Sequence, residues 1–169
     1  MAKDINWGII GLGAIAHQFA AAILLAKNAN LQGVASRSLS KAKEFAQQYE
    51  ADTYYSDYKS LATDDDIDIV YIATPNTFHL ENTLLCLHNN RSVLCEKPLG
   101  VSSGEVEEMI QAARSRNLFL MEAIWTQFIP AYRKAMQLLE NGVIGSVKSV
   151  DANFGFKKDF DAESRLFNR

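Results

Sequence analysis

Residues 7–26 read WGIIGLGAIAHQFAAAILLA, and this stretch decides the fold. It begins as a short apolar strand, turns at two glycines and continues as an alanine-rich helical pattern. Within it, Gly11, Gly13 and Ala16 form the pattern G-x-G-x-x-A. Gly11 allows a sharp turn because no Cβ blocks positive φ. Gly13 lets the main chain approach a pyrophosphate, and Ala16 lets the helix lie close to the strand.

The helix after the glycines makes this turn a candidate phosphate site. A helix N-terminus carries unpaired N–H groups and a partial positive charge, and both attract phosphate. The pattern alone is weak evidence, since glycines turn chains in many folds, and a plain strand–turn–helix is the alternative. Its place directly after a strand and before a helix is the context that a dinucleotide-binding motif requires. We therefore expect a dinucleotide site here.

Strand and helix patterns alternate along the first 122 residues. Short apolar strands without polar alternation, such as IVYIA at residues 69–73, suit a parallel sheet that is covered on both faces. The alternation predicts the α/β class, with a Rossmann-like doubly wound parallel sheet. Ser102 with Glu105 forms a candidate capping box, and Asn117 is expected to end that helix. Strands are expected near 5–10, 31–36, 52–55, 67–73, 92–95 and 118–122, and helices near 14–27, 39–49, 57–62, 77–89 and 103–116.

The pattern changes after residue 122, which predicts two domains, 1–122 and 123–169. A helix is expected over 130–141, followed by an alternating strand over 145–156, typical of an antiparallel sheet with one packed face. This marks the start of a second α/β domain with a mainly antiparallel sheet. An isolated strand is not a stable unit, so we expect the sequence to be the front of a longer protein, or a product that lacks its second half. A sheet built on this strand would form a homo-oligomer in that protein.

Composition and charge exclude several classes of function. The net charge of −3 gives no support for nucleic-acid binding, and no apolar run reaches the roughly 18 residues of a membrane span. The N-terminus lacks a signal-peptide pattern, so a cytoplasmic protein is expected. Cys86 and Cys95 lack metal spacing and are expected as reduced thiols. Metal-site, serine-nucleophile and P-loop motifs are absent from the sequence.

The end of the second strand predicts which dinucleotide binds. NAD sites usually place an acidic residue there, to bind the ribose 2′-hydroxyl. This chain instead has Ser36, Arg37 and Ser38, a guanidinium flanked by hydroxyls that suits a 2′-phosphate. We therefore expect NADP to be favoured, with NAD possible. The alternative is a solvated surface arginine.

The fourth and fifth strands end in polar residues at the same edge of the expected sheet. Strand four ends in Thr74-Pro75-Asn76, where Asn76 is expected to cap the next helix. Strand five ends in Glu96-Lys97, about 10 Å from strand one, where a partly buried lysine is a useful proton donor and Glu96 could orient its ammonium. The alternative for Lys97 is a surface lysine.

The remaining polar residues carry less specific expectations. His79 is placed either at the border of the cofactor or in a packing role. His17 and His88 lack evident partners and are expected on helix surfaces. The aspartates of the loop before strand four are expected to be solvated: Asp64, Asp65, Asp66 and Asp68.

Four segments together resemble the Gfo/Idh/MocA family of NAD(P)-dependent oxidoreductases, and the likeness covers almost the whole chain. They are GIIGLGAIA, IATPN, CEKPLG and MEAIWTQFIPAYRKAMQLLENGVIGSVKSV. VASRSLSKAKEFA with MEAIWT is most similar to the branch of dihydrodiol dehydrogenases and NADP-dependent D-xylose dehydrogenases. The E-K-P segment is fairly specific, and the full set is highly specific. The resemblance implies hydride transfer between a nicotinamide and a CH–OH carbon of a sugar, polyol or cyclic diol.

The resemblance also implies roles for individual residues. Lys97 would bind the cofactor and help to transfer a proton to or from the substrate oxygen. Glu96 would lie near the nicotinamide ribose, and Trp125 and Phe154 near the nicotinamide and the substrate. The pyrophosphate would be held by Gly11, Gly13, Ala14, Ile15 and Ala16. The full set of expected cofactor residues adds Ser36, Arg37, Ser38, Thr74, Pro75, Asn76 and His79.

Two departures from the family leave alternatives open. Members are about twice as long and carry a downstream D-x-G-x-Y/H-type motif, whose Tyr or His works with the lysine. Many also have arginine where Gln127 stands. An inactive cofactor-binding fragment is therefore one alternative to an enzyme. A dinucleotide-binding sensor without chemistry is another, because the glycine turn and Arg37 would serve a sensor equally well. A sensor has no need of the E-K-P segment.

Overall fold

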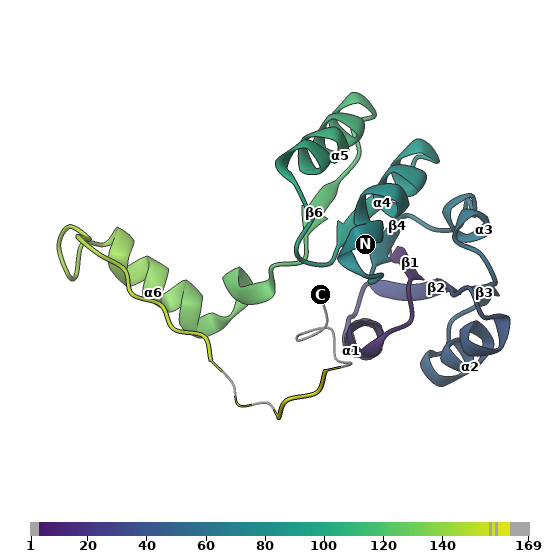
Figure 1. Cartoon of the computed structure of the whole chain (residues 1–169), viewed down its shortest axis with the longest axis horizontal. Coiled ribbons are helices and arrows are strands. Elements are labelled where there is room, and N and C mark those ends of the chain that lie inside the picture. Colours follow the sequence, from purple (N-terminus) through teal and green to yellow (C-terminus); the bar gives the residue numbers. More distant parts are fainter. Residues whose placement is uncertain (1–3, 156, 158, 163–169) are drawn as a thin grey trace. The chain divides into compact units, whose positions relative to one another are not determined.

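The computed structural model of the chain describes residues 4–155, 157 and 159–162. The chain divides into two compact units, Met1–Ile124 and Trp125–Arg169, and each is described by itself (Figure 1). In the described part of the chain, no helix has both the length and the apolar character needed to cross a membrane.

The first unit alternates strands and helices almost as the sequence predicts. Its strands are β1 (Ile5–Ile10), β2 (Ala29–Ala35), β3 (Thr53–Tyr55), β4 (Ile69–Ile72), β5 (Ser92–Cys95) and β6 (Leu120–Glu122). Its helices are α1 (Ala14–Leu25), α2 (Leu39–Tyr49), α3 (Tyr58–Ala62), the short η1 (Asn76–Phe78), α4 (His79–His88) and α5 (Ser103–Ser115). The second unit contains η2 (Trp125–Phe128) and α6 (Pro130–Glu140).

The six strands form one parallel sheet in the order β3-β2-β1-β4-β5-β6. The chain starts in the middle of the sheet, builds outward through β2 and β3, and then returns to the other side of β1 through β4. This reversal is the topological switch point at which doubly wound folds bind their ligands. The predicted Rossmann-like α/β fold is therefore confirmed.

Helices cover both faces of the sheet, which explains the apolar strands (Figure 1). On one face, α1 and α2 pack Ala16, Ala20 and Phe45 against Val34 and Tyr71. The other face is covered by α3, α4 and α5, and its buried core consists of Ile10, Ala35, Leu61, Ala62, Ile67, Val70, Ile72, Cys86, Leu87, Val93, Cys95 and Ala113. A strand that is buried on both sides has no solvent face on which to alternate polar residues.

Helix ends follow the predicted capping chemistry with one exception. The hydroxyl of Ser102 accepts a hydrogen bond from the Glu105 N–H at 3.3 Å, while the Glu105 carboxylate accepts one from the Val101 N–H at 3.0 Å. Asn117 has a φ of 53° and follows the last turn of α5. The prediction that Asn76 caps the next helix is wrong. Asn76 begins η1, and the cap of α4 forms no side-chain hydrogen bond.

In the second unit, α6 forms as predicted, whereas the expected strand does not. Residues 146–155 have no strand structure, and the predicted last residue of the strand, 156, lies outside the described residues. A strand needs a hydrogen-bonded neighbour, and the described residues of the second unit supply none. The alternation of apolar and polar residues in this segment is typical of a half-buried strand, but alternation alone is not sufficient to form one.

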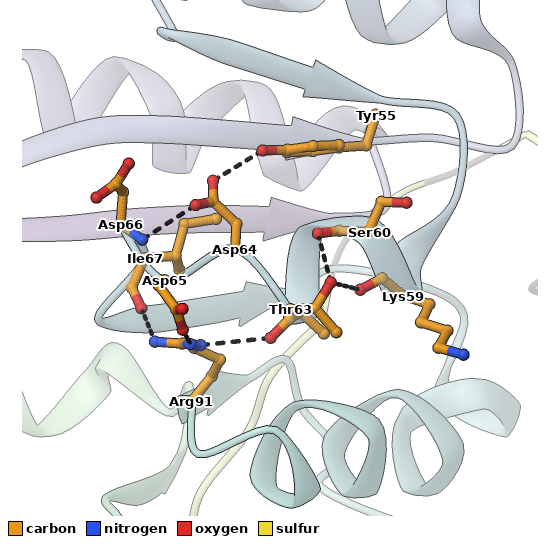
Figure 2. A network of polar contacts seen from close by, with 10 residues as sticks. Tyr55, Lys59, Ser60, Thr63, Asp64, Asp65, Asp66, Ile67 and Arg91 are labelled. Atoms are coloured by element: carbon orange, nitrogen blue, oxygen red, sulfur yellow. Dashed lines mark hydrogen bonds and ion pairs between the residues drawn. The ribbon is translucent and has the colours of Figure 1, made fainter.

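Polar contacts join the loop before β4 to its neighbours (Figure 2). Asp65 and Asp66 are exposed, as the prediction of a solvated loop requires, but Asp64 and Asp65 also contact neighbouring side chains. The Tyr55 hydroxyl donates to the Asp64 carboxylate at 2.7 Å. The Arg91 guanidinium donates to the carbonyls of Ala62 and Ile67, at 3.3 and 2.9 Å, and pairs with Asp65. This network lies at the amino end of β4, the edge of the sheet opposite to the glycine turn. We assign it to holding α3 against β4.

The two thiols, Cys86 on α4 and Cys95 at the end of β5, are free and fully buried in the core. Burial raises the pKa of each thiol to about 12. At pH 8 the reactive thiolate is then only about one part in ten thousand, because each pH unit below the pKa lowers it about tenfold. We expect iodoacetamide to leave both thiols of the native chain unmodified at pH 8 and to modify both in denaturant. Mass spectrometry measures this, and rapid modification of either native thiol would contradict the burial described here.

Candidate functional site

The strand register brings the predicted site segments to one edge of the sheet. Ile10 pairs with Ala35 on one side and with Ile72 on the other, and Ile72 pairs with Cys95. These four residues end β1, β2, β4 and β5 at the same level. The segments that follow them, which begin at 11, 36, 73 and 96, therefore leave the sheet together at the switch point.

The turn after β1 needs glycine at its first position for two reasons. Gly11 has a φ of +87°, a conformation that side chains disfavour. A Cβ there would also lie 2.8 Å from the main-chain carbon of Ala73 and the nitrogen of Thr74. The Gly11 N–H donates to the Ala35 carbonyl at 3.2 Å. The turn is therefore wedged between the ends of β2 and β4.

The second glycine has a different environment. A Cβ on Gly13 would meet no protein atom within 4 Å. Gly13 is the N-cap of α1, with no side-chain cap and no acidic residue in the first turn. Gly13, Ala14 and Ile15 are exposed, whereas Ala16 is fully buried against the sheet. This open cradle at an uncapped helix N-terminus fits a phosphate group.

The end of β2 places a free cation beside a second helix N-terminus. Ser38 is the N-cap of α2, and its hydroxyl accepts from the Lys41 N–H at 3.4 Å. The Ser38 N–H donates to the Ser36 hydroxyl at 3.2 Å. Arg37 lies exposed between them, and within the described residues its guanidinium has no ion-pair or hydrogen-bond partner. This arrangement can accept a second anionic group.

His79 lies under the ends of β4 and β5 and is only 1% exposed. Its Nδ1 lies 2.8 Å from the Pro98 carbonyl oxygen, and its Nε2 lies 3.0 Å from the Thr74 carbonyl oxygen. The Asn82 side chain donates to the Thr74 hydroxyl at 3.1 Å. Both ring nitrogens of His79 thus face main-chain carbonyls. The geometry favours the packing alternative for His79, which ties two edge segments together, and direct contact with a cofactor stays a prediction.

At the end of β5, Glu96 and Lys97 adopt different environments. The Glu96 carboxylate accepts from the Tyr71 hydroxyl at 2.6 Å and from the Lys97 main-chain N–H at 3.2 Å. Within the described residues, no ion pair joins this carboxylate to the Lys97 ammonium. The suggestion that Glu96 orients the ammonium is therefore wrong for this structure. Lys97 is exposed, so its amine is available to a ligand at this edge.

Three residues that hydrogen-bond to segments of the candidate site were not predicted from the sequence. Tyr71 holds Glu96, Asn82 holds Thr74, and the Glu122 carboxylate accepts from the Leu99 N–H at 2.8 Å. No sequence pattern pointed to Tyr71, because its contact depends on the strand register: Tyr71 is paired with Leu94, and Glu96 lies two residues further along the same face. His17, expected without a partner, lies 3.0 Å from the Tyr49 hydroxyl through its Nδ1.

The two predicted substrate residues belong to the second unit. Trp125 begins η2 and is 68% exposed, and Phe154 is 94% exposed in a segment without helix or strand. Their part in a substrate pocket stays a prediction. The remaining edge residues, Pro75 and Asn76, are exposed beside the buried Thr74.

Comparison with protein families gives a match over residues 5–124. The matching model describes an oxidoreductase family with an NAD-binding Rossmann fold, named GFO_IDH_MocA. The match spans all six strands of the first unit.

The chain is also similar to curated mammalian enzymes. It is 43% identical over 153 residues to trans-1,2-dihydrobenzene-1,2-diol dehydrogenase of Sus scrofa, which covers 89% of this chain and 46% of that protein. It is 42% identical over 153 residues to the enzyme of that name from Homo sapiens, with the same coverage. The chain thus spans about half the length of the curated relatives that it matches.

Solved structures with the same fold include complexes with either nicotinamide cofactor. Scyllo-inositol dehydrogenase from Lactobacillus casei, with bound NAD(H) and scyllo-inositol, has a TM-score of 0.79 at 29% identity, over 85% of this chain and 43% of that chain. A 3-ketoreductase from Actinomadura kijaniata, in complex with NADP and TDP-benzene, has a TM-score of 0.79 at 30% identity, over 83% and 43%. Proteins with this fold therefore use both cofactors.

Proposed function

The chain belongs to the Gfo/Idh/MocA family of oxidoreductases with an NAD-binding Rossmann fold, and from this premise we propose that it binds a nicotinamide dinucleotide across the switch point of its sheet. Gly13, Ala14 and Ile15 would hold the pyrophosphate at the N-terminus of α1. The single observation that carries this proposal is the open cradle at Gly13, next to a Gly11 that the fold itself requires. Glu96 and Lys97 would lie at the nicotinamide end.

We propose further that the protein is a dehydrogenase acting on a CH–OH carbon of a sugar, polyol or cyclic diol. The diol-dehydrogenase relatives, at 42–43% identity, support the substrate class. The bound cofactor would supply hydride transfer at the nicotinamide ring. Lys97 would hold the substrate hydroxyl and move its proton, a role for which an exposed amine at the end of β5 is suitably placed. The second catalytic residue would be the Tyr or His of the D-x-G-x-Y/H-type motif that the longer family members carry.

The experiment that tests this proposal is cofactor binding followed by turnover. Calorimetry measures binding of NADPH and NADH to the chain. The absorbance of reduced nicotinamide then reports turnover by the product of the intact gene with NADP and a trans-dihydrodiol, D-xylose or an inositol. Binding with turnover supports an oxidoreductase, and binding with no redox change for any substrate supports the sensor alternative. Failure to bind either cofactor would overturn the proposal.

NADP is the cofactor that we propose, because Arg37 is free to pair with a 2′-phosphate. Replacing Arg37 with alanine is expected to weaken NADPH binding about ten- to a hundredfold, since a hydrogen bond to a charged group contributes about 1.5–3 kcal/mol. Binding of NADH, which lacks that phosphate, is expected to change less than about threefold. Calorimetry on both cofactors gives the ratio. The matched control is Arg114→Ala, the same change on an exposed part of α5. Equal affinities for NADPH and NADH in the unmodified chain would remove Arg37 from the argument.

The second unit is proposed as the beginning of a substrate-binding and dimerisation domain. Its helix α6 exposes two apolar side chains one turn apart on the same face, Tyr132 at 43% and Met136 at 37%. Such a face gains stability when another surface covers it. We propose a homo-oligomer formed through this region, in the cytoplasm, with no nucleic-acid or membrane partner. Light scattering of the intact gene product measures the oligomeric state.

A further inference from the structure

The contact between Tyr71 and Glu96 is the strongest feature of the edge that the proposed function does not use. Tyr71 is 2% exposed, and its ring stacks on Phe19 with centroids 3.8 Å apart and an interplanar angle of 19°. Trp7 meets the edge of Phe19, with a centroid distance of 5.1 Å. The aromatic ring therefore sits in a fixed slot between α1 and the sheet, and only its hydroxyl reaches toward the edge.

The Tyr71 hydroxyl donates to the half-buried Glu96 carboxylate, which also accepts a hydrogen bond from the main chain. Oε1 of Glu96 accepts from Tyr71 at 2.6 Å, and Oε2 accepts from the Lys97 main-chain N–H at 3.2 Å. The Glu96 N–H itself donates to the Ile72 carbonyl at 2.9 Å. Burial, and then the bond to Glu96, raise the pKa of Tyr71 far above its ordinary value, so the phenol stays a neutral donor at any working pH.

We propose that Tyr71 is a positioning residue, whose phenol clamps the Glu96 carboxylate onto the Lys97 main chain and keeps it away from the Lys97 ammonium. Two consequences follow. The segment that begins at Glu96 is ordered before a ligand arrives, which lowers the entropic cost of binding. Among the residues that the structure describes, the amine of Lys97 also has no ion-pair partner, so it is free to meet a substrate hydroxyl. This proposal rests on the proposed function, because it assigns the clamp a purpose at the nicotinamide end of the same site.

The test is a double-mutant cycle on the chain with Tyr71→Phe, Glu96→Gln and both together. Tyr71→Phe keeps the ring in its slot and removes only the hydroxyl. Calorimetric NADPH binding is expected to weaken roughly five- to twentyfold in Tyr71→Phe, because the loss of one charge-assisted bond loosens the segment. In the Glu96→Gln background, the same change is expected to have less than about a threefold effect, because residues that act through one contact are not additive.

A second measurement follows the reactivity of the Lys97 amine instead of the binding of NADPH. The labelling rate of Lys97 by a water-soluble acylating reagent is measured by mass spectrometry. In Tyr71→Phe, the released carboxylate can pair with the ammonium, so labelling is expected to slow roughly three- to tenfold. Labelling should return to the original rate in the double variant, where no carboxylate remains. A purely structural role for Tyr71 would change neither rate.

The matched control is Tyr55→Phe, which removes another tyrosine-to-carboxylate bond, at 2.7 Å to Asp64 in the loop before β4, and leaves the main chain of β3 in place. It is expected to leave NADPH affinity and Lys97 labelling unchanged. Failure of the unmodified chain to bind either cofactor would overturn the proposed function. Normal binding in the unmodified chain, with Tyr71→Phe indistinguishable from it or equally harmful in both backgrounds, would overturn the positioning role alone.

Discussion

Gly13→Ala is expected to remove cofactor binding from a chain that still folds. The Gly13 backbone, with φ −89° and ψ −174°, suits any residue, and a Cβ there meets no protein atom within 4 Å. Alanine is a poorer N-cap than glycine, which lowers stability, but it also restricts the unfolded chain, which raises stability. Because the two effects oppose each other, the free energy of unfolding should change by less than about 1 kcal/mol. The methyl group, however, would occupy the space where a pyrophosphate approaches the main chain. NADPH affinity should fall more than about a hundredfold, or about 3 kcal/mol.

Gly11→Ala provides the contrast to that variant. Its Cβ would lie 2.8 Å from main-chain atoms at the end of β4, in a residue whose φ is +87°. The substitution should destabilise the fold by at least about 2 kcal/mol, because neither the backbone angle nor the neighbouring strand can relax freely. Thermal unfolding and calorimetry on the two variants separate the roles. A Gly13→Ala chain that binds NADPH like the unmodified chain would place the pyrophosphate elsewhere.

Lys97→Ala is expected to lose turnover while it retains the cofactor. A positioned acid or base contributes about 10²- to 10⁴-fold to a proton transfer, so kcat should fall by a factor in that range. Lys97 is exposed and no carboxylate among the described residues pairs with it, so its removal should leave the fold unchanged. NADPH binding should weaken less than about tenfold, because the phosphates are held at α1 and α2. Turnover is measured on the intact gene product, and binding on the chain itself.

Lys59→Ala serves as the control for the lost positive charge. Lys59 is an exposed lysine on α3, a helix that contributes none of the proposed cofactor or substrate residues. It should retain the kcat and cofactor affinity of the unmodified protein. Turnover that survives in Lys97→Ala would exclude this amine as the proton-transfer group. A parallel loss of NADPH binding in that variant would instead assign Lys97 to cofactor binding.

The sequence predicted most of the sheet, because each strand and helix carries its own local pattern. Apolar runs of four to six residues identify the central strands, and the predicted boundaries differ from the observed ones by about two residues. The alternating stretch after residue 145 shows the limit of this reasoning. Its pattern is that of a strand, yet a strand also needs a neighbour to accept its hydrogen bonds, and a pattern within one segment cannot supply one.

Some residues of the candidate site could likewise be predicted from the sequence, whereas some of their contacts could not. Gly11, Gly13 and Arg37 could be named from the sequence because each follows a recognisable strand and precedes a helix. The partners of Glu96 could not. The sequence placed Glu96 beside Lys97 and suggested that the two charges meet, whereas the structure directs the carboxylate to a phenol 25 residues earlier. Charge attraction in water is weak enough that a buried hydrogen bond decides the orientation.

Local sequence patterns are sufficient to predict the order of strands and helices in the first unit, the glycine turn before α1 and the polar residues that follow the strands. These properties depend on backbone preferences and on the periodicity of neighbouring residues, which every local segment contains. Three contacts could be found in the folded chain alone: the bond from Tyr71 to Glu96, the bridge of His79 between Thr74 and Pro98, and the bond from Tyr55 to Asp64. Those contacts join different segments, and they exist only because the crossovers place the strands side by side in one register.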